Sequence, residues 1–187
     1  GGKILIALLL FGTATAWGVG IGESPSAPRE GAAAAAAQSY ADINAPFDSK
    51  YHFVRIRYGG GFGGFRRGRR GGTWSHDYPR AEYNFLQILK ETTYLGTQAE
   101  GSNVLTFDDP ELLKYPIAYI VEVGYWNPSD DEVRALGEYL LKGGFLIVDD
   151  TRDERGFELR NFAAHMERAL PGLALVTLDH DHDIFDS

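Results

Sequence analysis

Apolar residues along the chain fall into short runs that predict β-strands. Residues 51–58 alternate apolar and polar side chains and are rich in β-branched and aromatic types, the pattern of a strand with one buried face. The runs at 117–123 and 145–148 are almost wholly apolar, as in strands of a parallel sheet that is covered on both faces. Residues 103–107 predict a further short strand, and a weaker stretch at 173–176 predicts the last one.

Helical periodicity appears between these runs. Pro79 stands at a first-turn position, and apolar residues recur at helical spacing up to residue 94. Ser129 and Glu132 form a capping box at the start of a second helix, which a glycine pair ends, and a third helix is predicted at 157–169. Right-handed crossovers join strands and helices that alternate in this way. We therefore expect an α/β fold with a mainly parallel sheet and helices on both faces.

The first 22 residues have the composition of an export signal. Lys3 precedes a compact apolar run at 4–11, and the small residues at 14–16 match the pattern that a signal peptidase accepts. This pattern favours cleavage. No charge occurs between Lys3 and Glu23, however, so an uncleaved membrane anchor stays open as the alternative.

A linker and one domain follow the signal. Residues 23–46 are rich in Ala, Pro, Ser and Gly, and they have too few large apolar groups to offset the entropy of ordering. The α/β domain is expected to occupy residues 47–187. We expect an exported protein, periplasmic or extracellular, that contacts a membrane only through its N-terminal segment if that segment is not cleaved.

Composition and charge exclude several kinds of chemistry. The 187-residue chain has no cysteine, which excludes disulfides, thiolate zinc sites and a cysteine nucleophile. Residues 1–100 carry 11 Lys and Arg against 8 Asp and Glu, whereas residues 101–187 carry 7 against 18. The acidic second half repels phosphates and argues against nucleic acid as a partner. We expect the basic, Gly-rich loop at 59–72 to meet an acidic partner, a lipid headgroup or the domain's own acidic surface.

Several motifs occur in the order found in a known family. They are Phe53 to Tyr58, Trp74, Asp77-Tyr78-Pro79, Asp109 to Leu112, Tyr115-Pro116, Val121 to Gly124, Ser129 to Val133, Gly143 to Leu146, Asp149-Asp150, Asn161-Phe162 and His182 to Phe185. Over residues 51–187 the chain resembles the family catalogued as domain of unknown function 4159. The resemblance implies a bacterial, exported or membrane-tethered protein with a fold similar to class I glutamine amidotransferases, and no established activity. The sheet is then expected to be flavodoxin-like or glutamine amidotransferase-like.

The chain departs from the family pattern in two places. Asp183 stands where the family commonly has Pro, and the family pattern continues beyond residue 187, so we expect a domain truncated at its C-terminus. Glutaminase chemistry needs a nucleophile on a tight strand-to-helix turn, where this chain has Asp149, Asp150 and Thr151. Because the chain also lacks cysteine, glutaminase activity is not expected.

Two adjacent carboxylates are the main candidates for a site. Asp149 and Asp150 follow the predicted strand at 145–148, at the sheet edge where α/β folds bind ligands. They can ligate a hard cation or supply a general base, and the structural alternative is an N-cap beside a solvated loop acid. His182 would complete a catalytic set with them if it approached across the top of the sheet.

A second group of candidates lies near the C-terminus. His180, Asp181 and His182 offer nitrogen and oxygen ligands to a metal ion, although short His and Asp clusters near a terminus also form solvated turns.

Four loop residues are candidates for ligand binding. Trp74, Asp77, Tyr125 and Trp126 stand on loops that follow predicted strands, where aromatic and carboxylate side chains can enclose a polar ligand. In the alternative interpretation, Trp74 packs on the first helix and Asp77 caps it.

Two functions from different classes stay open. The first, which we favour, is a non-catalytic extracytoplasmic binding or scaffold module for an unknown protein or a small polar ligand. The second is a hydrolase or metal-dependent enzyme that uses Asp149, Asp150 and His182. No cofactor is expected, apart from a divalent cation if the second hypothesis holds.

Overall fold

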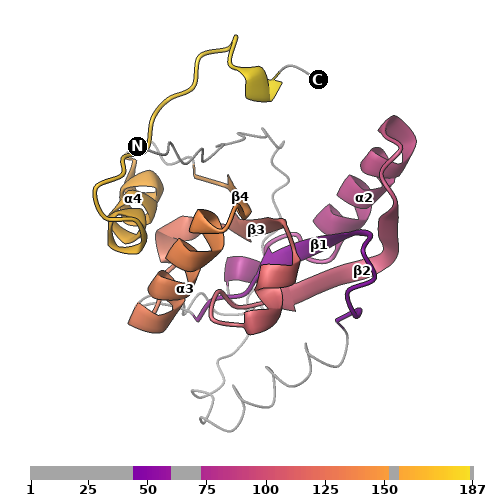
Figure 1. Ribbon diagram of the computed structural model, residues 1–187, viewed down its shortest axis with the longest axis horizontal. Coiled ribbons are helices and arrows are strands. Elements are labelled where there is room, and N and C mark those ends of the chain that lie inside the picture. Colours follow the sequence, from indigo (N-terminus) through magenta and orange to yellow (C-terminus); the bar gives the residue numbers. More distant parts are fainter. Residues whose placement is uncertain (1–43, 60–72, 152–155, 186–187) are drawn as a thin grey trace, which may run out of the picture.

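Four strands form one parallel sheet in the computed structural model, which describes residues 44–59, 73–151 and 156–185 (Figure 1). They lie side by side in the order β2-β1-β3-β4, and every neighbouring pair is parallel. The α/β fold with a mainly parallel sheet is therefore confirmed. In chain order the strands are β1 (Tyr51–Ile56), β2 (Thr97–Leu105), β3 (Ile117–Val121) and β4 (Phe145–Asp149).

One face of the sheet is covered by α2 (Arg80–Thr92), which follows β1. The ring of Phe85 meets that of Phe53 edge-on, and Glu82 forms an ion pair with Arg55 near the carboxyl end of β1. Residues two apart on a strand face the same side, so Phe53 and Arg55 define the face that α2 covers.

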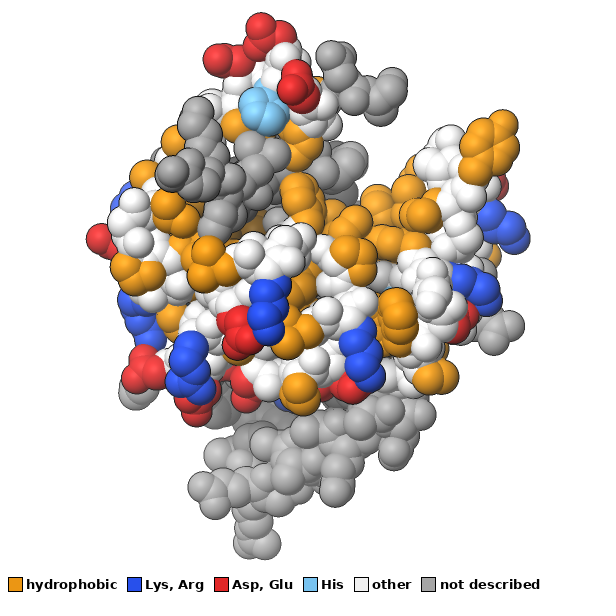
Figure 2. All heavy atoms as spheres, viewed as in Figure 1, with side chains coloured by type: hydrophobic (Ala, Val, Ile, Leu, Met, Phe, Trp, Pro, Cys, Tyr) orange, Lys and Arg blue, Asp and Glu red, His pale blue; other side chains and the backbone are white. Residues whose placement is uncertain are grey.

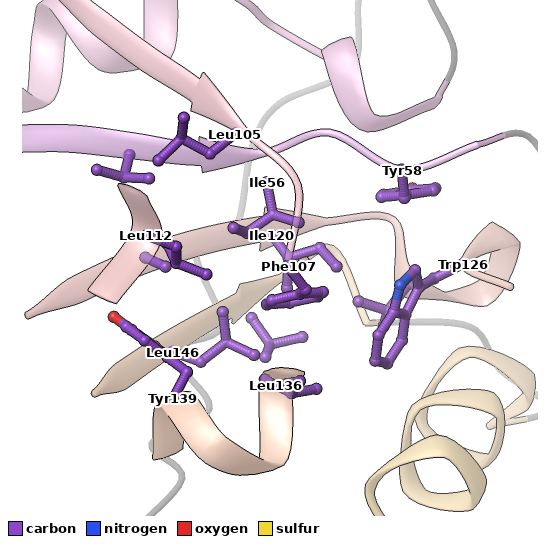
Figure 3. Packing of buried hydrophobic residues seen from close by; sticks show 14 of the residues in the cluster. Ile56, Tyr58, Leu105, Phe107, Leu112, Ile120, Trp126, Leu136, Tyr139 and Leu146 are labelled. Atoms are coloured by element: carbon purple, nitrogen blue, oxygen red, sulfur yellow. The ribbon is translucent and has the colours of Figure 1, made fainter. Parts of the chain in front are cut away.

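The opposite face carries the main hydrophobic core, beneath α3 (Asp130–Leu141) and α4 (Phe157–Ala169). Figure 3 shows Leu136 of α3 in the same cluster as Ile120 of β3, Leu146 of β4 and Phe107. No helix in the described part of the chain is long and apolar enough to cross a lipid bilayer. Short 3-10 helices complete the domain: η1 (Thr73–Ser75), η2 (Pro110–Lys114), η3 (Val123–Tyr125) and η4 (Asp183–Phe185).

The start of α3 is capped as predicted. The Ser129 side chain accepts a hydrogen bond from the Glu132 backbone N–H (3.1 Å), and the Glu132 carboxylate accepts one from the Ser129 N–H (2.9 Å). Two of the N–H groups that a helix leaves unbonded at its start are thereby satisfied. Gly143 follows the end of α3 with a φ of 97°, a left-handed conformation that favours glycine.

Two segments differ from the prediction. Residues 173–176 form no strand but an extended coil, because a strand forms only with a partner and none pairs with them among the described residues. In contrast, β2 begins at Thr97, ahead of the predicted 103, because Thr97 pairs with Tyr51 of β1 across an irregularity in the register. Asn44 and Ala45 also hydrogen-bond to β2, so contacts with the domain begin before residue 47.

The direction of the strand connections reverses near the centre of the sheet. The connection from β1 leads outward to β2, whereas the connection from β3 leads in the opposite direction to β4. Ligands of open α/β sheets bind beyond the carboxyl ends of the strands where the direction reverses in this way. The residues that follow β1, β3 and β4 therefore lie where a site is expected.

Candidate functional site

Three side chains from separate connections meet at the carboxyl edge of the sheet. His76 follows η1 in the connection from β1 to α2, Glu122 follows β3, and Asp150 follows β4. His76 Nδ1 lies 3.1 Å from Asp150 Oδ2 and 3.5 Å from Glu122 Oε1. One ligand atom from each of the three residues lies within 4.8 Å of the other two. We call this group the edge cluster.

A buried arginine positions the backbone around His76. Arg55 has no exposed surface, and its Nη1 donates hydrogen bonds to the carbonyl oxygens of Trp74 (2.9 Å) and His76 (3.3 Å). Its charge is paired with Glu82, and its guanidinium lies 4.8 Å from the centre of the Tyr119 ring. A buried charge is costly unless it is paired and hydrogen-bonded, so these contacts hold η1 in one place beneath His76.

The Tyr58 hydroxyl holds the turn that carries Glu122. It lies 2.8 Å from the carbonyl oxygen of Val121, 2.9 Å from that of Glu122 and 3.0 Å from Thr73 Oγ1. Burial is the main cause that raises the pKa of Tyr58, so the phenol stays protonated and remains a hydrogen-bond donor. Tyr58 therefore joins the segment before His76 to the end of β3.

The two adjacent aspartates have different surroundings. The Tyr119 hydroxyl donates to Asp149 Oδ2 (2.8 Å), and the Asp150 backbone N–H donates to Asp149 Oδ1 (2.7 Å). Both carboxylate oxygens of Asp149 are thus used to fix the turn after β4. The Asp150 carboxylate turns instead to His76. Asp149 is a positioning residue, and Asp150 is the member of the pair that joins the edge cluster.

Left-handed backbone is concentrated around the edge cluster. Asp77, Glu122 and Asp150 have φ values of 57°, 51° and 52°. A non-glycine residue in this conformation costs about 1–2 kcal/mol and persists only where its surroundings impose it. Elsewhere in the described segments, Ser49 is the one other non-glycine residue of this kind. Backbone strain gathered at one place is typical of functional sites.

Two of the ligand-atom distances in the edge cluster are close to those of a cation site, and the third lies within 4.8 Å. Two ligands at about 2.0–2.1 Å from a zinc ion, in tetrahedral directions, lie about 3.4 Å apart. The distances from His76 to the two carboxylates, 3.1 and 3.5 Å, are close to that value. The side chains of His76, Glu122 and Asp150 are 28%, 22% and 26% exposed, so solvent and ions reach them.

The donor set favours certain cations and leaves one structural alternative. Imidazole suits Zn²⁺ and Fe²⁺, and carboxylates suit Mn²⁺, so one histidine with two carboxylates fits a divalent transition metal better than Ca²⁺ or Mg²⁺. Without a cation, a protonated His76 would form ion pairs with both carboxylates. That arrangement would join the three connections without binding anything.

The two tryptophans predicted to bind a ligand belong to the hydrophobic core. Trp74 is 4% exposed and packs beside Tyr78 at the start of α2. Trp126 is 1% exposed, and its ring meets those of Phe107 and Phe162. Neither tryptophan presents a free face to a ligand, because the apolar interior takes up both rings.

Asp77 and Tyr125 lie at the surface instead. The Asp77 carboxylate is 65% exposed and lies 3.8 Å from His76 Nδ1, while its carbonyl oxygen accepts the N–H of Ala81 in the first turn of α2. Tyr125 is 44% exposed and ends η3, three residues after Glu122. Both residues therefore flank the edge cluster along the chain.

The structure does not bring the C-terminal candidates to the edge cluster. His180 and Asp181 are exposed on the segment at the top of Figure 2. His182 hydrogen-bonds within its own turn, where its N–H donates to Asp179 (3.1 Å) and its Nδ1 accepts from Ile184 (3.2 Å). Within the described ranges, its ring nitrogens form no ligand group with Asp149 or Asp150.

Sequence patterns did not identify His76 or Glu122. A single histidine in a loop has no spacing that marks it as a ligand. Glu122 does carry a signal, because it is the one charged residue in the otherwise apolar run at 117–123. A charge at the end of a strand that is buried on both faces indicates a site more strongly than a charge on a helix surface.

A separate hollow lies between α3 and α4. Its volume is about 620 Å³, and Val133, Gly137 and Ala169 form part of its apolar lining, beneath charged side chains from both helices. None of its lining residues belongs to the edge cluster.

Comparison with known proteins identifies the family of the chain. A search of curated proteins returned no match. The family model described as "Domain of unknown function (DUF4159)" matches residues 52–187. This range contains nearly the whole sheet, α2 to α4 and all three residues of the edge cluster. The chain therefore belongs to the DUF4159 family of domains of unknown function.

Proposed function

We propose that this domain is a binding module that holds a divalent transition-metal cation at the carboxyl edge of its sheet and, through the cation, a small polar ligand. The convergence of His76, Glu122 and Asp150 carries the proposal, because three separate connections bring their ligand atoms within 4.8 Å. Three side chains that hydrogen-bond to the residues around the edge cluster also support the proposal. Arg55, Tyr58 and Tyr119 each fix one of the three connections, as a preorganised site requires.

The charge and the ligand count fit a site that binds a further molecule. Two carboxylates balance the charge of a divalent cation, and a neutral imidazole adds the third ligand. A site with three protein ligands leaves at least one coordination position for water or for an oxygen atom of a ligand. The partial exposure of the three side chains supports access from solvent.

The surroundings of Asp149 favour binding over hydrolysis. A metal-dependent hydrolase needs a base within reach of the attacking water. Asp149, one of the two adjacent carboxylates that the sequence suggested as a cation ligand or a general base, has both oxygens engaged by Tyr119 and by the Asp150 backbone. A hydrolase is the second candidate, and the open coordination position is the observation that supports it.

We also propose that the domain works outside the cytoplasm, on a flavodoxin-like sheet. The apolar run behind Lys3, which lies outside the described residues, supports export. The strand order β2-β1-β3-β4 agrees with the first four strands of the flavodoxin order.

Titration calorimetry of the chain with Zn²⁺, Mn²⁺ and Mg²⁺ tests the cation site. We expect one Zn²⁺ or Mn²⁺ ion to bind per chain, with Mg²⁺ much weaker. Asp150→Asn, Glu122→Gln and His76→Gln should each weaken binding by more than about 100-fold, because loss of a direct ligand exceeds the 10–100-fold cost of losing an outer contact.

Another His–Asp pair provides a matched control. His52 lies 2.8 Å from Asp48, at the opposite end of β1, and no second carboxylate of the described segments forms an ion pair with it. Asp48→Asn should therefore leave cation binding unchanged. Absence of binding to the unaltered chain, or equal binding by the edge-cluster variants, would contradict the proposal. Cation-dependent turnover of a chromogenic ester or phosphodiester that Asp150→Asn abolishes would favour the hydrolase instead.

A further inference from the structure

One face of α3 carries charges of alternating sign at a regular spacing. Four charged side chains of α3 and its C-cap recur every four residues, so they form one stripe along the helix. In chain order they are Asp130, Arg134, Glu138 and Lys142. Their side chains are 96%, 74%, 55% and 58% exposed, and all four line the hollow between α3 and α4. The rim of this hollow therefore presents an acidic, basic, acidic, basic series to solvent.

The floor of the hollow is apolar and has no bulky side chain at its centre. A Cβ on Gly137 would lie 2.3 Å from the Ala169 carbonyl oxygen, so the backbones of α3 and α4 approach closely there. Leu141 lines the same hollow and is 70% exposed. A protruding leucine thus lies beside a depression that a second leucine could fill, as a knob fills a hole in helix packing.

The stripe charges already form ion pairs within one chain, and these pairs are exposed. They are Glu138–Lys142 (2.6 Å), Asp131–Arg134 (2.7 Å) and Asp130–Arg168 (2.6 Å). A spacing of four is also common on solvated helices, where it supports pairs within the helix, but among these three only Glu138–Lys142 has that spacing. Exposed pairs contribute little to stability, so the same charges can exchange partners when a second surface approaches.

The stripe is complementary to a second copy of itself. Two α3 helices can pack antiparallel about a two-fold axis at the level of Leu136. Asp130 then faces Lys142 of the second copy, and each such pair occurs twice. Arg134 faces Glu138 of the second copy in the same register. A parallel arrangement would instead place like charges together. The order of the charges therefore selects another copy of this chain in one orientation.

We propose that the hollow between α3 and α4 is the interface of a symmetric dimer, in which the α3 helices of two copies pack antiparallel. Helical side chains lean toward the N-terminus of their helix, so Leu141 of each copy reaches the Val133 end of the other hollow. The two leucines supply an apolar centre, and the charged stripes form a polar rim around it. Such an interface is isologous and closes, so it produces a dimer and not a filament.

Sedimentation equilibrium of the 187-residue chain tests the dimer. We expect a reversible equilibrium between monomer and dimer. Arg134→Glu and Glu138→Arg should each raise the dissociation constant of their own dimer by about 10-fold or more, because two attractive pairs become repulsive. Mixed in equal amounts, these two variants should form a heterodimer, because both of its pairs then join opposite charges.

A pair of leucine variants tests the apolar centre. Leu141→Ala should raise the dissociation constant by about 10-fold, because both copies lose the side chain that fills the hollow. Leu113→Ala is the matched control, since Leu113 is 48% exposed on η2 and does not line the hollow. Because all of the substituted side chains are exposed, each variant should keep the thermal midpoint of the unaltered chain.

Three results would overturn the proposal. The first is a monomer mass at every concentration. The second is a dimer that Leu141→Ala and the two charge variants leave unchanged, since its interface would lie elsewhere. The third is a mixture of the charge variants that associates no more strongly than either variant alone. None of these results bears on the cation site, because the hollow and the edge cluster share no residue.

Discussion

Replacement of Asp149 should destabilise the domain more than replacement of Asp150, although the two residues are adjacent. Asp149 accepts hydrogen bonds from the Tyr119 hydroxyl (2.8 Å) and from the Asp150 N–H (2.7 Å). A hydrogen bond to a charged group contributes about 1.5–3 kcal/mol. With a discount for partial exposure, Asp149→Ala should lower the free energy of unfolding by about 2–4 kcal/mol. Asp150→Asn keeps a residue type that tolerates the left-handed conformation, so its effect should stay within about 0.5 kcal/mol.

Equilibrium unfolding in urea gives the free energy of unfolding of both variants. An unchanged m-value shows that the same unfolding transition is compared. Tyr119→Phe removes one donor to Asp149 and, combined with Asp149→Ala, completes a double-mutant cycle for that bond. The pKa of Tyr119 gives an independent readout. Burial raises this pKa most, and the charge of Asp149 raises it further. Tyrosinate absorbance should therefore show the pKa of Tyr119 moving down in Asp149→Ala.

Equal losses of stability in Asp149→Ala and Asp150→Asn would refute the division of roles between the two aspartates. A larger loss in Asp150→Asn would indicate that the edge cluster is a structural ion-pair network. A pKa of Tyr119 that does not respond to Asp149→Ala would show that the two side chains are not hydrogen-bonded in solution.

Two further predictions concern the buried charge and alkaline pH. Arg55→Met leaves the Glu82 carboxylate without its ion-pair partner while the Glu82 side chain is only 2% exposed. The substitution should lower the free energy of unfolding, measured in urea, by about 3–5 kcal/mol. Arg55→Met with Glu82→Leu should recover most of that loss, and equal stability of the single and double variants would contradict this. Burial raises the pKa of Tyr51 from 10.0 to about 12, so its contribution to stability is full below pH 10 and is lost as the pH rises through 12. The thermal midpoint of unfolding should fall as the pH rises through this interval. A midpoint that stays constant would contradict the predicted titration of Tyr51. Burial also raises the pKa of Tyr58, Tyr115, Tyr119 and Tyr139.

Local sequence patterns were enough to predict most of the elements. The apolar runs at 117–123 and 145–148 became β3 and β4, and the capping box at Ser129 began α3 where expected. These features depend on neighbours within a few residues, because side-chain period and capping are local properties of the backbone. The carboxyl end of β4 was also expected to carry a candidate site, and Asp150 lies there in contact with His76.

Tertiary structure alone decided which residues share that edge. His76 and Glu122 join Asp150 because crossovers bring separate connections to one end of the sheet, and no local pattern records which loops will meet. Residues 173–176 were predicted wrongly for the same reason. Their composition favours a strand, but a strand forms only when a partner strand lies alongside. The same limit explains why the two aspartates differ. As neighbours in the sequence, the two aspartates look equivalent. In the folded domain, only Asp149 accepts a hydrogen bond from the Tyr119 hydroxyl on the adjacent strand.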